Sequence, residues 1–374
     1  KTGSCKVLVV TGCMAQRYKN EIIEEVPEVD AVLGTTSYGD ILKAIREAME
    51  GKHFQEFKDI DYLPEKLGKR VLTTGGHFGY LKIAEGCDKH CTYCIIPKLR
   101  GKFRSVPMER LIEQAKEMAE EGVKELILVA QETTVYGTDI YGKKSLHILL
   151  KELCKIKGIR WIRVLYCYPE EIYDELIQTM KEEKKICHYL DLPIQHASDR
   201  ILKRMGRRTT QAELVEIVNK LRREIPDIVL RTTLISGFPG ETQEDHEELM
   251  SFVDEMEFDR LGVFTYSPEE DTPAATMPDQ VAEEVKEARR DEIMELQQEI
   301  SYEKNQQMIG STQKVLIEGY LVDDDVYVGR TYRDAPGVDG IVFVSAPYEL
   351  ISGSFVDVKI TEANEYDLTG VIVE

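Results

Sequence analysis

The chain has 374 residues and a mass of 42.8 kDa. A chain of this length is longer than most domains with a single hydrophobic core, so we predict two or three domains. Its 42% hydrophobic and 31% charged residues are typical of a folded globular protein and exclude a disordered or collagen-like chain. Lys and Arg number 48 against 68 Asp and Glu, and the formal charge of −20 disfavours nonspecific nucleic-acid binding. No apolar run approaches the roughly 18 residues of a membrane span, and no signal-peptide pattern is present. We therefore expect a soluble cytoplasmic protein without a membrane partner.

The first 50 residues alternate between strand and helix patterns. Short apolar or β-branched runs at 6–11 and 29–33 predict strands, and residues 16–25 and 41–49 have helical composition. This pattern predicts part of an α/β domain over residues 1–50, followed by a linker over 51–78 that lacks clean periodicity. A βα fold rarely starts almost directly with a strand, so we expect that further N-terminal residues precede Lys1.

Residues 79–308 repeat a strand-then-helix unit six times. Predicted strands lie at 79–85, 125–130, 161–166, 188–192, 228–235 and 261–266. Predicted helices lie at 108–121, 145–156, 171–183, 212–224 and 243–256, with a long polar helix at 281–308. Six such units in series predict an α/β fold with a parallel sheet, a partial (β/α)6 barrel covered by helices. In such folds the chemistry lies at the carboxyl ends of the strands.

Residues 311–374 form a compositionally distinct C-terminal segment. Strand patterns at 313–320, 326–330, 341–345 and 355–361 are separated by turns and predict a small all-β barrel or sandwich. The segment holds 4 Lys and Arg against 12 Asp and Glu. An RNA-binding barrel needs a basic face, because phosphate contacts supply most nonspecific affinity. The acidic segment favours a basic protein partner, with an acidic surface that serves solubility alone as the alternative.

Three of the eight cysteines, Cys87, Cys91 and Cys94, form a C-x3-C-x2-C motif directly after the first barrel strand. In a long chain without a secretory signal, reduced thiols that bind metal are favoured over disulfides. Three thiolates on one loop suit three corners of an iron–sulfur cluster and leave the fourth iron open. The alternative is a structural zinc site, which needs four ligands. No second cysteine pair exists, and His90 lies between two cysteines where ligand geometry is poor.

This motif at the end of the first strand of a six-unit barrel resembles the radical S-adenosylmethionine (SAM) superfamily. The resemblance implies a 4Fe-4S cluster on the three cysteines, whose open iron binds SAM and cleaves it to a 5′-deoxyadenosyl radical. Tyr93 matches the aromatic residue that packs near the adenine of SAM. Later strand ends match SAM-contacting positions in the same order, at Gln131 and Glu132, Gln195 and Arg207, and Ser236 and Gly237. For a single glycine-rich turn, and for Arg207, a structural or surface role is the alternative.

Residues 11–18 (TGCMAQRY) and 27–30 (PEVD) resemble the N-terminal domain of the methylthiotransferases in this superfamily. That family carries three cysteines there for an auxiliary 4Fe-4S cluster, and Cys13 matches the third. A buried thiol is the alternative for Cys13, and Cys5, inside the strand pattern, is expected in the core. The other two ligands would precede Lys1. The resemblance therefore implies two clusters in the full-length protein, with the auxiliary one absent from this N-terminally truncated chain.

The resemblance covers nearly the whole chain, and its C-terminal barrel matches a TRAM domain. One branch of the family modifies adenosine in tRNA, and another modifies an aspartate of a small-subunit ribosomal protein. Residues 131–134 (QETT), 166–169 (YCYP) and 195–200 (QHASDR) resemble the second branch. The implied function is methylthio transfer to the β-carbon of that aspartate, with an electron donor as a further partner and tRNA disfavoured. The alternatives are a tRNA adenosine methylthiotransferase and a non-catalytic metal-binding or ribosome-associated protein.

Overall fold

The computed structural model describes residues 3–63 and 71–373, so residues 64–70 of the predicted linker lie outside the described part of the chain. The chain divides into two compact units. The first comprises residues 1–71, 85–90 and 94–104, and the second comprises residues 72–84, 91–93 and 105–374. Within the described ranges, none of the helices combines the length and apolar character needed to cross a membrane.

The first unit contains a small parallel sheet in the order β1 (Val9–Thr11), β2 (Ala31–Leu33) and β3 (Phe54–Glu56). Its helical elements are α1 (Cys13–Tyr18), α2 (Glu21–Glu25), the 3-10 turn η1 (Tyr38–Asp40), α3 (Ile41–Met49) and α4 (Ile96–Arg100). Apolar side chains of α3 pack on the fully buried β2, which forms the core of this sheet. β3 falls inside the stretch predicted as linker and extends the N-terminal sheet.

Two local predictions for this unit were wrong. The helix predicted over 16–25 is two helices, because Lys19 has a φ of 45° and cannot continue the right-handed helix. The prediction that Cys5 lies in the core was also wrong, since Cys5 is exposed. Strand pairing begins only at Val9, opposite Ala31, so Cys5 has no neighbouring strand against which to be buried.

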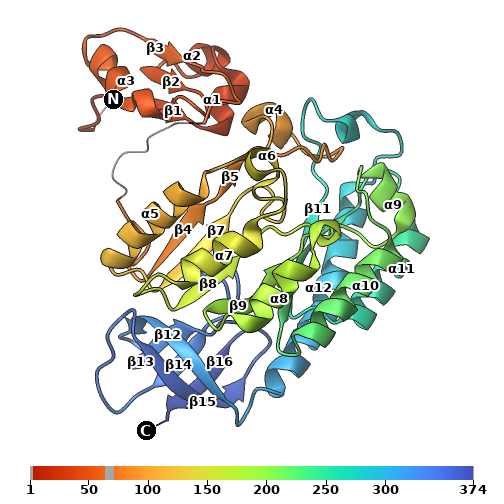
Figure 1. Cartoon of the computed structure of the whole chain (residues 1–374). Coiled ribbons are helices and arrows are strands. Elements are labelled where there is room, and N and C mark those ends of the chain that lie inside the picture. Colours follow the sequence, from red (N-terminus) through yellow and green to blue (C-terminus); the bar gives the residue numbers. More distant parts are fainter. Residues whose placement is uncertain (1–2, 64–70, 374) are drawn as a thin grey trace. The chain divides into compact units, whose positions relative to one another are not determined.

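The second unit is built around a six-stranded sheet in the order β11-β10-β9-β8-β7-β4, in which every pair is parallel (Figure 1). Its strands are β4 (Phe78–Lys82), β7 (Glu125–Val129), β8 (Trp161–Val164), β9 (Ile186–Asp191), β10 (Val229–Ser236) and β11 (Arg260–Thr265). The short strands β5 (Ala84–Glu85) and β6 (Arg104–Ser105) flank the cysteine motif. The predicted partial (β/α)6 barrel is thereby confirmed.

The sheet is covered by crossover helices (Figure 1). These are α5 (Met108–Glu120), α7 (Leu146–Cys154), α8 (Asp174–Glu182), α10 (Gln211–Glu224), α11 (Gln243–Met256) and α12 (Glu283–Gln306). Shorter helical elements are α6 (Thr138–Tyr141), η2 (Pro169–Glu171), α9 (Asp199–Arg204) and η3 (Pro273–Thr276). Capping boxes at Thr210 and Thr242 satisfy backbone donors at the first turns of α10 and α11 and fix where both helices begin.

The C-terminal strands close into a five-stranded barrel in the order β12-β13-β14-β16-β15. Its strands are β12 (Thr312–Leu321), β13 (Val326–Arg330), β14 (Val342–Ser345), β15 (Phe355–Ala363) and β16 (Leu368–Ile372). Inward-facing Val315, Ile317, Val342 and Val358 form its core. The sequence patterns did not predict β16, which pairs with both β14 and β15 and is needed for closure.

Charged residues join this small barrel to the amino-terminal end of the large sheet. Glu125, at the start of β7, is fully buried and accepts hydrogen bonds from Arg163 Nε (2.8 Å) and Arg330 Nη2 (2.7 Å). Arg260, at the start of β11, pairs with Asp334 at 2.7 Å. These buried pairs close the amino-terminal end of the sheet, opposite the end where the catalytic side chains are expected.

Candidate active site

Within the second unit, residues 91–93 of the cysteine motif are fixed by the loop that follows α9. Thr92 donates through its backbone N to Met205 O (2.9 Å) and through Oγ1 to Arg204 O (2.8 Å). Ala274 N, in η3, donates to Thr92 O at 2.9 Å. Cys91 is only 5% exposed. Segments far apart in the sequence therefore hold this part of the motif in one conformation.

An aromatic cluster surrounds Tyr93. The Tyr93 ring stands edge-on to Phe238, with ring centroids 6.3 Å apart, and Phe238 stands edge-on to Tyr266 at 5.2 Å. Phe238 and Tyr266 are buried, whereas Tyr93 is half-buried. Phe238 therefore supports the Tyr93 ring by an apolar contact, while part of the ring remains accessible to a ligand. A residue that packs against a planar base needs both features.

Arg207 is a buried charged residue at this end of the sheet. Its guanidinium is almost fully buried, lies 4.2 Å from the ring centroid of Tyr168, and pairs with Glu170 at 3.4 Å. Burial opposes its charge, but Glu170 and the neighbouring phenols raise the pKa of Arg207 above its usual value. Among the described residues, its Nε and Nη1 have no hydrogen-bond partner. A buried cation with two donors available can bind an anionic group such as a carboxylate.

The residues after β7 serve mainly to join two strand ends. Glu132 is buried, and its Oε1 accepts hydrogen bonds from Thr134 N (2.9 Å), Thr134 Oγ1 and Tyr168 N (3.5 Å). Glu132 thus ties the end of β7 to the segment after β8. Gln131 is half-buried beside it. The predicted SAM contact of both residues stays a prediction.

Gln195 and the start of the loop after β10 show backbone conformations that suit a binding edge. Gln195 has a φ of 75°, rare for a residue with a side chain, and bridges Leu234 of β10. Gly237 has a φ of +70°, and a Cβ there would lie 2.1 Å from Cγ of Lys286. Ser236 is buried and donates to Lys286 O at 2.7 Å. Ser236 and Gly237 therefore determine the conformation of this loop, which packs against Lys286 of α12.

Glu241 anchors the same loop from its far end. Its Oε2 accepts from the backbone N of Gly237 (2.8 Å) and Phe238 (3.1 Å), and its Oε1 pairs with Arg289 at 2.9 Å. Burial alone would raise the pKa of Glu241, but the His196 ring, with Nε2 3.6 Å from Oε2, and the charge of Arg289 hold this pKa below its usual value. No sequence pattern predicted a role for Glu241 or Arg289, although Glu241 lies only four residues after the predicted site residue Gly237.

The first unit holds the remaining cysteines of both predicted sites. Cys87 is buried and donates through its backbone N to Gly101 O at 3.1 Å, and Cys94 is half-buried. Cys13 opens α1 and is half-buried, and Arg100 Nε donates to its Sγ at 3.2 Å. Arg100 also lies 3.5 Å from Oε2 of Glu85. Arg100, which follows the cysteine motif in sequence, is thus hydrogen-bonded to Cys13, the predicted ligand of the auxiliary cluster.

All eight cysteines are free thiols, so the soft donors that a thiolate-bound cluster needs are available. Within residues 3–63 and 71–373, no three or more His, Cys, Asp or Glu side chains gather closely enough to hold a metal ion. Free thiols thus fit an iron–sulfur cluster in their chemistry, whereas the ligand set of Cys87, Cys91 and Cys94 is not seen as a metal site among the described residues and stays a prediction.

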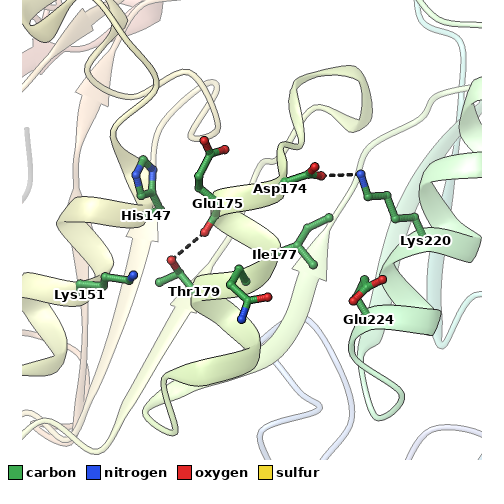
Figure 2. Close-up of a pocket in the computed structure, with 9 residues that line it drawn as sticks. His147, Lys151, Asp174, Glu175, Ile177, Thr179, Lys220 and Glu224 are labelled. Carbon is green, nitrogen blue, oxygen red and sulfur yellow. Dashed lines mark hydrogen bonds and ion pairs between the residues drawn. The ribbon is translucent and has the colours of Figure 1, made fainter.

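A separate pocket of about 700 Å³ lies between α7, α8 and α10 on the outer side of the sheet (Figure 2). Its lining is charged, with Lys220 paired to Asp174 across it and Thr179 bonded to the backbone of Glu175. None of the predicted site residues lines it. This pocket is therefore distinct from the strand-end site.

Comparison with known proteins agrees with this architecture. The family models for the Radical SAM superfamily and the TRAM domain match residues 81–253 and 309–373. A protein of Lachnoclostridium phytofermentans named ribosomal protein uS12 methylthiotransferase RimO is 64% identical over 99% of this chain and 84% of its own length. Proteins of the same name from Clostridioides difficile and Clostridium perfringens are 52% and 53% identical, over 100% and 99% of this chain and 84% and 82% of their own lengths. The chain therefore belongs to the ribosomal protein uS12 methylthiotransferase RimO family of radical SAM proteins.

Proposed function

We propose that this protein transfers a methylthio group to the β-carbon of an aspartate in ribosomal protein uS12, in the cytoplasm. The observation that carries the proposal is the identity of 64% over nearly the whole chain to a relative with that named activity. The strand-end site supports it, because its aromatic support, buried cation and shaped loop match a SAM-binding edge.

Cys87, Cys91 and Cys94 would hold a 4Fe-4S cluster, which when bound supplies the electron that cleaves SAM. The residues of this chain then bind and orient SAM. Tyr93 supports the adenine, and the two available donors of Arg207 take a carboxylate. The backbone near Gln195 and Gly237 shapes the edge on which SAM lies. Gln131, Glu132 and Ser236 complete the proposed set of SAM-binding residues.

Cys13 would be a ligand of a second 4Fe-4S cluster, from which the methylated sulfur is inserted. Support comes from the hydrogen bond that Arg100 Nε donates to its sulfur at 3.2 Å, because hydrogen bonds to the sulfur of a metal-bound cysteine orient the ligand.

The TRAM barrel would bind the basic substrate protein rather than tRNA. Of its four basic residues, Arg330 and Arg333 are buried and paired with carboxylates. The carboxylate side chains of Asp334 and Asp339 in this segment are buried as well, so the excess of acidic over basic residues in the sequence count of 4 against 12 remains outside the buried pairs. Asp323 and Asp324, both exposed, lie in the turn between β12 and β13. An acidic surface attracts a basic partner and repels phosphate.

The test is mass spectrometry of uS12 after anaerobic incubation with the full-length protein, SAM and a reductant that replaces the electron donor. We expect the target aspartate to gain one methylthio group and SAM to yield 5′-deoxyadenosine. Cys91→Ser should abolish both products, whereas the matched control Cys154→Ser should retain them. Thiomethylated tRNA with unchanged uS12 would establish the tRNA alternative. Bound zinc without SAM cleavage would establish the non-catalytic one.

A further inference from the structure

A tyrosine hydroxyl faces one cysteine of the cluster motif. Tyr168, which follows β8, lies with its Oη 3.7 Å from Sγ of Cys91, within hydrogen-bonding range of the larger sulfur atom. Both residues belong to the second unit. A cysteine bound to iron is a thiolate and has no proton to give, so in the loaded protein Tyr168 must be the donor.

The surrounding residues hold this tyrosine in place. Its backbone N donates to Thr134 Oγ1 (3.3 Å) and Glu132 Oε1 (3.5 Å), at the end of the neighbouring strand. The guanidinium of Arg207 lies 4.2 Å from its ring centroid, and a cation over the ring draws electron density from the phenol. The O–H of Tyr168 is thereby made a better donor.

One loop positions both partners of this contact. The loop after α9 supplies Met205 O, which accepts from Thr92 N beside Cys91, and two residues later supplies Arg207, which covers Tyr168. The contacts of this loop with Thr92, next to Cys91, and with the ring of Tyr168 therefore fix the distance between Tyr168 Oη and Cys91 Sγ. Tyr168 belongs to the motif of residues 166–169, from which no role for its side chain could be predicted.

We propose that Tyr168 is a positioning residue whose hydrogen bond to the Cys91 sulfur raises the reduction potential of the cluster. The inference rests on the proposed function, because it requires a cluster on Cys91. Reduction adds negative charge to the cluster and its sulfur ligands. A donated hydrogen bond stabilises that charge, which is one of the means by which proteins tune such potentials.

The test is an EPR-monitored potentiometric titration of the whole chain after anaerobic reconstitution with iron and sulfide. Every protein carries Cys13→Ser, so that the barrel cluster alone is observed. Tyr168→Phe removes the donor and keeps the ring. We expect an unchanged iron content and a reduction equilibrium about tenfold less favourable, which is a potential more negative by ~59 mV for a one-electron couple. Tyr166→Phe, at a 49% exposed tyrosine two residues away, should leave the potential unchanged.

Equal potentials for Tyr168→Phe and its parent would overturn the inference while leaving the proposed function intact. Failure of the parent itself to bind a cluster would overturn both. Should Tyr168→Phe fail to fold, as circular dichroism would show, 3,5-difluorotyrosine at position 168 replaces it. This more acidic phenol is a stronger donor while it remains protonated, so the titration is done at a pH below its pKa. The potential should then become more positive, and an unchanged or more negative potential would refute the inference.

Discussion

Removing the carboxylate of Glu125 should destabilise the second unit strongly, because this side chain neutralises two buried guanidinium groups. In Glu125→Gln, the amide oxygen can accept from only one of the two guanidinium groups, and the negative charge that both share is lost. Arg163 then keeps Tyr332 O (2.7 Å) as an uncharged acceptor, while its Nη2 has no acceptor among the described residues. Arg330 retains Glu318 at 2.7 Å. Removing one partner of a buried ion pair typically costs about 3–5 kcal/mol, because a buried charge is left without compensation, and we expect a loss of this size in the free energy of unfolding.

The assay is guanidinium-induced unfolding of wild type and Glu125→Gln at pH 7, followed by circular dichroism. The matched control is Glu318→Gln, whose side chain is 21% exposed, and which should cost only about 1 kcal/mol because water compensates for the lost carboxylate. A cost below about 1 kcal/mol for Glu125→Gln, or an equal cost for both variants, would refute the reasoning. Burial opposes ionisation of Glu125, but Arg163 and Arg330 hold its pKa below the usual value, so its contribution should decline only in strong acid.

Three further changes test other parts of the structure. Gly237→Ala should lower the free energy of unfolding by about 1–3 kcal/mol, because φ at this position is +70° and the new Cβ would meet the side chain of Lys286. The control Gly262→Ala, which has open space around it, should change this free energy by less than about 0.5 kcal/mol in the same assay. Burial would raise the pKa of Asp245, but hydrogen bonds, of which the one from Arg200 has the largest effect, lower this pKa from 3.8 to about 2. The shift corresponds to about 2 kcal/mol of stabilisation of the folded state. This stabilisation is present above pH ~4 and lost as pH falls toward 2, so unfolding curves of wild type and Asp245→Asn should differ at pH 6 and converge in acid. Asp323→Lys combined with Asp324→Lys should weaken uS12 binding about fivefold in low-salt titration calorimetry and much less in high salt, and a salt-independent loss would contradict an electrostatic role.

The sheet of the second unit could be predicted from the sequence because local pattern and tertiary environment agree there. The β-branched run predicted over 228–235 is β10, Val229–Ser236, and the helix predicted over 243–256 is α11 with the same limits. Strand-end motifs then followed from topology, since parallel strands bring their carboxyl ends to one edge. Cys5 and β16 were missed because burial and pairing depend on which strands are neighbours.

The partners of individual site residues could not be predicted. The hydroxyl of Ser236 is bonded to Lys286 O, fifty residues further along the chain, and Arg207 is stacked on Tyr168. Such contacts depend on how loops from different strands fold over one another, which periodicity does not record. Sequence motifs thus predict binding at one edge of the sheet, but they do not predict which atoms of that edge remain available to a ligand.

The buried pairs between the TRAM barrel and the large sheet bear on how this family can evolve. Arg330 and Asp334 come from the small barrel, and their partners Glu125 and Arg260 come from the first residues of sheet strands. A TRAM domain transplanted from a protein with other side chains at these positions would leave charges buried without partners. Exchange of this domain between relatives should therefore succeed only when the matching residues of β7 and β11 are exchanged with it. Under the proposed function, substrate preference would then change by substitution on the face of the barrel that points away from the sheet, while the face that carries the buried pairs stays constrained.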